Sequence, residues 1–142
     1  MIRAVIDTHV FVSALLTPGS NASAILDWVR ANKIELLVSR SILAEIELVL
    51  QYPKLAKRHR MSPEQIREFL DAYARIAQIT EEKMEVRAIK ADPADDKYVA
   101  CAVEGGADFI ISGDHRLTEL KTYRGIRIVT PGDFVEIIKA KE

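Results

Sequence analysis

The sequence predicts an α/β fold, a three-layer α/β/α sandwich in which helices flank a central, mainly parallel sheet of about four to five strands. Segments of strand length alternate with helical segments along the whole chain, and most of the strand candidates are continuously apolar, as is typical of strands covered on both faces. With 142 residues, the chain has the usual length of one domain, so we expect residues 1–142 to form a single domain around one core.

The first fifty residues predict two strands and three helices, taken in chain order. The apolar run at 2–6 is a strand candidate, and the apolar segment after it has the length of a short helix that stops at a Pro-Gly turn. Residues 20–33 predict a helix, because a Ser-Asn start offers a cap and apolar residues recur on one face. Residues 34–39 predict a buried strand, and 41–50 predict a helix closed by a Tyr-Pro pair.

The middle of the chain carries the clearest helix start in the sequence. Residues 62–79 begin with a capping serine, a proline at the first helical position and a glutamine at the third, and an apolar face continues from there. The basic segment KLAKRHR at 54–60 leaves two alternatives open, the solvated face of a short helix or a phosphate-contacting surface. Residues 80–91 are the least periodic and predict a short strand or an extended connection.

The last third returns to strict alternation. A helix is predicted from Asp95 to the Gly-Gly pair at 105–106, which is typical of a helix end. Residues 107–112 predict a strand, 115–120 a short helix and 126–130 another strand. A Thr-Pro-Gly-Asp sequence then starts the final helix.

Composition excludes several classes of protein. The hydrophobic fraction is 49% and the net charge is −1, which fits neither a disordered chain nor one that coats nucleic acid by bulk charge. Cys101 is the lone cysteine and lies in an apolar run, so we expect a small core residue. The chain lacks the pattern of a signal peptide and any apolar stretch long enough to cross a bilayer, so we expect a cytoplasmic protein with no membrane partner.

Acidic residues follow the predicted elements at one edge of the sheet. In an open parallel sheet, ligands bind outside the carboxyl ends of the strands. Asp7 follows the first strand and Asp114 follows the strand at 107–112, while the helices preceded by DPADD (92–96) and containing LAEIE (43–47) start on the same edge. Acids from four segments are therefore expected to meet there.

Helical angle separates the acids of DPADD. At 3.6 residues per turn, Asp95 lies on the same side as the apolar face of its helix, Asp96 lies about a quarter-turn away, and Lys97 falls on the opposite, solvent-facing side. Asp92 precedes a proline and is expected to cap or shape the turn. A carboxylate on the buried side of a helix is costly unless it is paired or binds a cation, so Asp95 is the metal-ligand candidate.

The donor set then indicates the cation. Glu45 and Glu47 lie at the two margins of an amphipathic helix, and periodicity leaves the choice between them open. With no second cysteine and no close histidine pair, structural zinc is disfavoured, whereas carboxylate oxygens suit Mg²⁺ or Mn²⁺. Metal-assisted phosphoryl chemistry is the leading reaction class.

Three stretches of the sequence resemble the PIN-domain ribonucleases. They are VIDTHVFVSALL (5–16), LAEIELVL (43–50) and DPADDKYVACAVEGGADFIISGDHRL (92–117), and they occur in the family's order. The resemblance covers essentially the whole chain and is strongest to the small, VapC-like toxins of prokaryotic toxin-antitoxin pairs. It implies a PIN-like fold and a metal-dependent endoribonuclease.

The resemblance also implies roles for individual residues. It favours Glu45 over Glu47 and assigns catalysis and Mg²⁺ or Mn²⁺ binding to Asp7, Glu45, Asp95 and Asp114. Thr8 and Ser112 match hydroxyl positions that orient a carboxylate or a metal-bound water, with Asp96 beside them at the rim. His9 stands where the family more often has asparagine, and we expect a packed or hydrogen-bonded side chain there. Water activated by the metal would attack an RNA phosphodiester in line.

Partners follow from the same resemblance. Basic residues near the rim are candidates for contacting the RNA backbone: Arg40, Arg116, Lys57 and Arg58. A cognate antitoxin and a homodimer are implied, although the apolar faces of the helices at 22–31 and 64–79 are expected to pack into the core. The alternative is a non-catalytic PIN-fold domain that binds RNA or protein. A phosphoacceptor domain is disfavoured, because a second acid after the first strand and a lysine after the last are missing.

Overall fold

The computed structural model describes residues 1–86 and 95–141, and its centre is a sheet of six strands among those residues. The strand order is β3-β2-β1-β4-β6-β5, and every neighbouring pair is parallel except the antiparallel pair of β5 and β6. The bounds are β1 (Ile2–Ile6), β2 (Ile34–Ser39), β3 (Gln78–Thr80), β4 (Phe109–Ile111), β5 (Thr122–Tyr123) and β6 (Ile126–Val129). The predicted α/β class with a mainly parallel sheet is confirmed.

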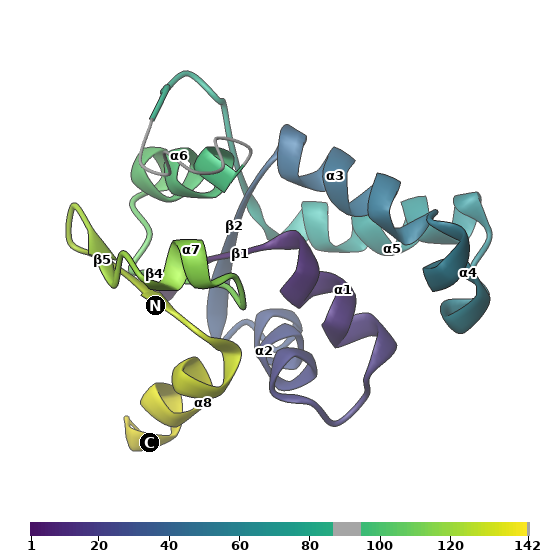
Figure 1. Ribbon diagram of the computed structural model, residues 1–142, viewed down its shortest axis with the longest axis horizontal. Helices are drawn as coiled ribbons and strands as arrows, with labels where there is room; N and C mark the ends of the chain where they lie inside the picture. Colours follow the sequence, from purple (N-terminus) through teal and green to yellow (C-terminus); the bar gives the residue numbers. More distant parts are fainter. Residues whose placement is uncertain (87–94, 142) are drawn as a thin grey trace.

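Helices cover the sheet on both sides. Figure 1 shows α6 on one side and α2 and α8 on the other, with α3, α4 and α5 extending together beyond one end of the sheet. The bounds are α1 (Thr8–Leu16), α2 (Asn21–Arg30), α3 (Arg40–Leu50), α4 (Pro53–His59), α5 (Pro63–Ile76), α6 (Asp96–Gly105), α7 (His115–Thr118) and α8 (Pro131–Ala140). None of these helices has the length and apolar character needed to span a bilayer.

The register of the central strands positions the candidate site. Ile6 of β1 lies opposite Ile111 of β4, and the backbone N–H of Asp7 donates to the carbonyl of Ile111 at 3.0 Å. The two residues that follow these strands, Asp7 and Ser112, therefore leave the sheet side by side. Both strands are fully buried from Ala4 and Phe109 onward, so this edge is anchored in the core.

The sheet has six strands, whereas the sequence predicted four to five, and the two short strands β3 and β5 account for the difference. The helix predicted over 62–79 ends at Ile76, and the extended residue Ala77 leads into the short edge strand β3. Strand β5 has only two residues and pairs antiparallel with β6. Both are too short for an alternation of apolar and polar residues to reveal them. Residues 87–91 of the stretch predicted as extended lie outside the described residues.

Packing of the predicted helical faces is as expected. The apolar face of α2 and that of α5 are buried in the core, through Ala22, Ile25, Leu26 and Val29 in α2 and Ile66, Leu70 and Tyr73 in α5. The capping box at Ser62 and Gln65 is present. Cys101 is buried and the Thr80 hydroxyl lies 3.6 Å from its sulfur, which confirms the core role.

Candidate active site

Asp7 is a buried carboxylate held by main-chain and side-chain donors. It caps the start of α1, where its Oδ1 accepts from the Val10 N–H at 2.8 Å, and its Oδ2 accepts from the Ser112 hydroxyl. The residue is only 3% exposed. Burial raises the pKa of Asp7, although the hydrogen bonds from Ser112 and Val10 oppose that shift.

Ser112 connects Asp7 to Asp114. Its hydroxyl donates to Asp7 and accepts from the backbone N–H of Asp114 at 3.0 Å, and the side chain is completely buried. A hydroxyl with a single proton can satisfy both contacts because it donates once and accepts once. The family resemblance predicted that Ser112 orients a carboxylate, and its hydroxyl does contact the carboxylate of Asp7.

Asp114 and Asp95 meet through their side chains. The backbone N–H of Arg116 donates to Asp114 at 2.9 Å and lowers the pKa of that carboxyl, and a hydrogen bond with the Asp95 side chain lowers it further. The Oδ2 oxygen of Asp95 is buried. Neighbouring carboxyl groups disfavour each other's ionised form, so a bound cation would be favourable at this place.

Glu45 projects from α3 into a cluster of hydroxyl groups. One of its oxygens, Oε1, accepts from the hydroxyls of Thr8 and Tyr98. The backbone N–H of Thr8 lies 3.3 Å from the Tyr98 oxygen, and the two hydroxyl oxygens are 2.9 Å apart. Because Thr8 directly follows Asp7, this cluster adjoins the aspartate group.

The second oxygen of Glu45 is paired with Lys97. The Lys97 ammonium lies 2.6 Å from Glu45 Oε2, and the two side chains are 23% and 31% exposed. Burial acts to raise the pKa of Glu45, but the hydrogen bonds from Lys97, Thr8 and Tyr98 outweigh it and hold the pKa below its usual value. The prediction that Lys97 faces solvent is therefore wrong.

The helical-angle argument failed for α6 because the buried face is displaced. Cys101 and Gly105 belong to that face, whereas Val103, which the pattern had included, is only half-buried. Because the buried face is displaced, Lys97 lies at the margin of that face and is close enough to contact Glu45 on α3. Asp96 is also buried, at 9% exposure, and does not face water.

Tyr98 and Lys97 are the site residues that the sequence analysis missed. A signal for Tyr98 existed, since a buried tyrosine hydroxyl needs a hydrogen-bond partner and this one lies in the first turns of a helix that faces the acidic edge. Its partners could not be identified, because Thr8 and Glu45 are 90 and 53 positions away.

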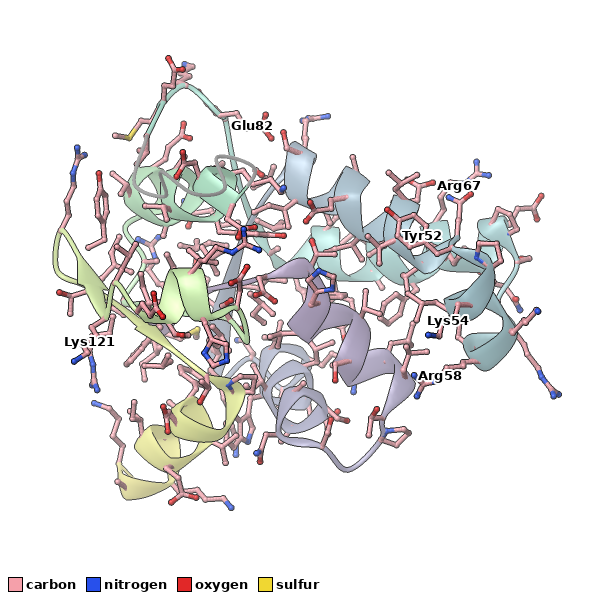
Figure 2. All side chains as sticks on the ribbon, viewed as in Figure 1. Tyr52, Lys54, Arg58, Arg67, Glu82 and Lys121 are labelled. Atoms are coloured by element: carbon pink, nitrogen blue, oxygen red, sulfur yellow. The ribbon has the colours of Figure 1, made fainter. Side chains whose placement is uncertain are left out.

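The remaining predicted residues lie in different parts of the structure, some at the site and some away from it. Arg116 lies at the site, with Nε 3.6 Å from Asp114, and Arg40 is exposed at the start of α3. Lys57 and Arg58 are exposed on α4, and Figure 2 shows Arg58 on the side of that helix that faces α1. His9 is exposed, so of the two expected environments, packed or hydrogen-bonded, the packed one is wrong. Asp92 lies outside the described residues.

The described residues fit a divalent cation in part. Within residues 1–86 and 95–141, no three His, Cys, Asp or Glu side chains surround a common point at metal-binding distances. The acidic residues are linked in pairs instead: the Asp95 side chain influences the Asp114 carboxyl, and the Ser112 hydroxyl joins the Asp7 carboxylate to the backbone N–H of Asp114. Their all-oxygen chemistry suits Mg²⁺ or Mn²⁺, whereas Glu45 already has a cationic partner.

Comparison with known proteins identifies relatives along the whole chain. An uncharacterized protein of Methanocaldococcus jannaschii is 32% identical over 143 residues, which covers 95% of this chain and 90% of that protein. Among solved structures, PAE2754 from Pyrobaculum aerophilum superposes with a TM-score of 0.57 at 12% identity, over 98% of this chain and 90% of the other.

Two further structures share the fold. FitAcB from Neisseria gonorrhoeae has a TM-score of 0.59 at 17% identity, and VapBC2 from Rickettsia felis, bound to a DNA fragment from their promoter, has 0.54 at 13%. Each match covers 91% of this chain and 98% of the other. The family model described as PIN domain matches residues 3–116, from the first strand to the acidic residues after β4. The chain belongs to the PIN domain family.

Proposed function

We propose that this protein is a metal-dependent endoribonuclease that hydrolyses phosphodiester bonds of RNA. PIN domains are generally nucleases. The observation that carries the proposal for this chain is the gathering of Asp7, Asp95 and Asp114 from three segments: the Ser112 hydroxyl joins the Asp7 carboxylate to the backbone N–H of Asp114, and the Asp95 side chain lowers the pKa of Asp114.

Asp7, Glu45, Asp95 and Asp114 would hold the divalent ion, Mg²⁺ or Mn²⁺. When bound, that ion supplies activation of a water molecule and neutralisation of charge on the phosphate oxygens. The surrounding residues of the protein orient the carboxylates. Ser112 fixes the direction of Asp7, and the N–H groups of Val10 and Arg116 hold one oxygen of Asp7 and one of Asp114. The burial that raises the pKa of Asp7 makes a nearby cation favourable at neutral pH.

RNA would approach the exposed side of this edge. Arg116 is placed to contact a phosphate beside Asp114, and Arg40 lies at the start of the helix that carries Glu45. Lys57 and Arg58 would act only on a strand long enough to follow α3 to α4. Such phosphate contacts position RNA without selecting its sequence.

The biological setting that we propose is a toxin-antitoxin pair. The fold shared with VapBC2 and FitAcB and the sequence resemblance to VapC-like toxins support this setting. In it, a cognate antitoxin would block the acidic edge, the toxin would form a homodimer, and both proteins would act in the cytoplasm.

One observation favours the non-catalytic alternative, a PIN-fold domain that only binds RNA or protein. Glu45 is neutralised by Lys97, and the described residues lack a group of three acids around one point. Calorimetric titration with Mn²⁺ separates the alternatives, because a non-catalytic domain of this kind is expected to show no divalent binding.

Cleavage of a defined single-stranded RNA tests the proposed activity. Wild-type protein should cleave with Mg²⁺ and not with EDTA, and Asp7→Asn and Asp95→Asn should lose cleavage because each removes a charged oxygen ligand. Asp71→Asn, at an exposed position of α5, is the matched control and should retain the wild-type rate. Unchanged cleavage by both site variants would contradict the proposal.

A further inference from the structure

We propose that Tyr52 and the basic face of α4 bind single-stranded RNA away from the acidic edge, with a base stacked on the Tyr52 ring and phosphates contacted by Lys54, Lys57 and Arg58. This inference rests on the proposed function, since it concerns the RNA on which the acidic site would act. It adds recognition of an unpaired base, which the acidic residues themselves do not provide.

Tyr52 is an exposed aromatic side chain between α3 and α4. It is 50% exposed, and it is the one aromatic residue among the large hydrophobic side chains exposed in the described part of the chain. Among the described residues, its ring packs against no other aromatic ring or cation, and its hydroxyl makes no hydrogen bond. An open aromatic face suits an unpaired base, because every base has a π surface that can stack.

The basic residues of α4 lie on one face of that helix. Lys54, Lys57 and Arg58 are exposed and stand at positions i, i+3 and i+4. Residues 51–63 include no acid, and within residues 1–86 and 95–141 no carboxylate forms a salt bridge with these three cations. Figure 2 shows Tyr52, Lys54 and Arg58 at the same end of the molecule, beside α4. The positive charge of this face therefore suits the phosphates of RNA.

His59 fixes α4 against the end of α3. Its Nε2 lies 2.6 Å from the carbonyl oxygen of Leu50, the last residue of α3, and its Nδ1 accepts from the Met61 N–H at 2.9 Å. Tyr52 lies in the short connection between the two helices, so its position is fixed by the same contacts. A surface that is already ordered loses little conformational entropy when it binds a ligand.

One side of α3 connects the acidic edge to this surface. Glu45, Leu48 and Tyr52 stand at positions i, i+3 and i+7, so they follow one side of the helix and its last turn over roughly 10 Å. Leu48 is 60% exposed, so this side of the helix is open to a ligand between the site and α4. A strand of RNA bound at the acidic edge could therefore continue along α3 to Tyr52.

The charge of the surface favours RNA over a second copy of this chain. The exposed apolar residues Leu48 and Tyr52 alone would suit either partner. A two-fold contact centred on α4 would bring the like-charged residues of both copies together, which is unfavourable. RNA offers bases for the aromatic ring and phosphates for the cations at the same time.

Binding of the defined single-stranded RNA in EDTA tests the inference without cleavage. With a fluorescein label on the RNA, anisotropy should show binding by Tyr52→Ala that is weaker by about fivefold or more, the effect of losing one stacked base. Tyr52→Phe keeps the ring and should bind as the wild type does. Ile76→Ala truncates an equally exposed apolar side chain on α5 and is the matched control, with no expected change. Wild-type affinity in Tyr52→Ala would overturn the inference.

A duplex made from the same RNA separates stacking from charge. Paired bases are not free to stack on Tyr52, so Tyr52→Ala should bind the duplex as the wild type does. Lys54→Met/Arg58→Met should weaken binding of both RNAs and reduce its salt dependence. Lys139→Met/Lys141→Met removes two exposed cations at the end of α8 and should have little effect. Equal weakening of duplex and single strand by Tyr52→Ala would contradict base stacking.

Two further measurements cover misfolding and a different occupant. Circular dichroism checks each variant, and Tyr52→Leu, which keeps an apolar side chain without the ring, should bind the single strand as weakly as Tyr52→Ala. Sedimentation tests for a second copy: a wild-type dimer that Tyr52→Ala dissociates, with RNA affinity unchanged, would overturn the inference.

Failure of the inference can be told from failure of the proposed function. Tyr52→Ala retains every acidic residue, and the binding assay in EDTA needs neither metal nor cleavage. Ring-dependent binding by a wild-type protein that does not cleave RNA would refute the proposed function alone. Metal-dependent cleavage by a protein whose RNA binding ignores Tyr52 would refute the inference alone.

Discussion

Asp7 is a residue of the candidate site whose buried charge lowers the stability of the fold. It is almost completely buried, and burial raises its pKa, which means that the ionised carboxylate is less favourable in the folded chain than in the unfolded one. A folded-state pKa above the unfolded value adds stability at low pH, and that contribution is lost as the pH rises through the folded pKa. At neutral pH without metal, the charge of Asp7 is therefore destabilising.

Asp7→Asn should raise the melting temperature of the metal-free protein at pH 7. Asparagine keeps the cap on Val10 N–H and removes the buried charge. Because the wild-type carboxyl takes up a proton as the pH falls, the advantage of the variant should shrink toward pH 4. Thermal unfolding in EDTA at the two pH values measures this, and a variant less stable than the wild type at pH 7 would contradict it.

Asp7→Ala provides the companion measurement. It removes the buried charge together with the helix cap, and loss of a cap costs about 1 kcal/mol. The alanine variant should therefore be less stable than the asparagine variant by roughly that amount at pH 7. Equal stabilities would mean that the cap contributes nothing.

At the scale of residues, the sequence predicted where the carboxylates lie but not which side chains contact them. Asp7 and Asp114 could be placed because Asp7 directly follows a buried strand and Asp114 comes shortly after another. Ser112 was placed through the family resemblance. Lys97 could not be placed correctly, because its orientation depends on how α6 packs and its partner Glu45 lies 52 positions away.

At the scale of elements, α6 lies unusually close to the sheet at Gly105. A Cβ atom at this position would lie 2.8 Å from Leu37 Cδ1 and 3.3 Å from Thr80 Cγ2. Leu37 is completely buried and Thr80 nearly so, so an added methyl group would press on packed core side chains. The glycine thus sets the approach of the helix that carries Lys97 and Tyr98.

Gly105→Ala should destabilise the protein by about 1–3 kcal/mol, the usual cost of overpacking a core. Gly132→Ala is the matched control, since Gly132 also lies in a helix but an added Cβ there would meet only Asn21 Nδ2, at 3.4 Å. That control should be neutral or more stable by up to about 1 kcal/mol. Chemical denaturation measures both, and equal effects would contradict the packing argument.

Element prediction from the sequence succeeded where capping and periodicity agreed. The start of α5 at Ser62 and Pro63 and the end of α6 at Gly105 and Gly106 were both predicted. The end of α5 was not, because Ala77, Gln78 and Ile79 continue a pattern compatible with a helix. Pairing of Gln78–Thr80 with β2 decides that these residues form a strand, and such long-range pairing cannot be derived from local propensity.

At the scale of the whole molecule, sheet topology gathers the acidic residues. Strands β1 and β4 are neighbours although more than a hundred positions separate them, and their parallel register brings Asp7 beside Ser112 and Asp114. The rule that ligands bind at the carboxyl edge of such a sheet predicted this edge from sequence. It could not predict that Glu45 would be linked to Lys97, since that depends on side-chain contacts between α3 and α6.

A crystal of the protein soaked in Mn²⁺ and measured for anomalous scattering tests the central claim most directly. We predict an anomalous peak in contact with carboxylate oxygens of this acidic group, those of Asp7, Asp95 and Asp114 among them. Absence of manganese from these three carboxylates would contradict the proposed metal-dependent site.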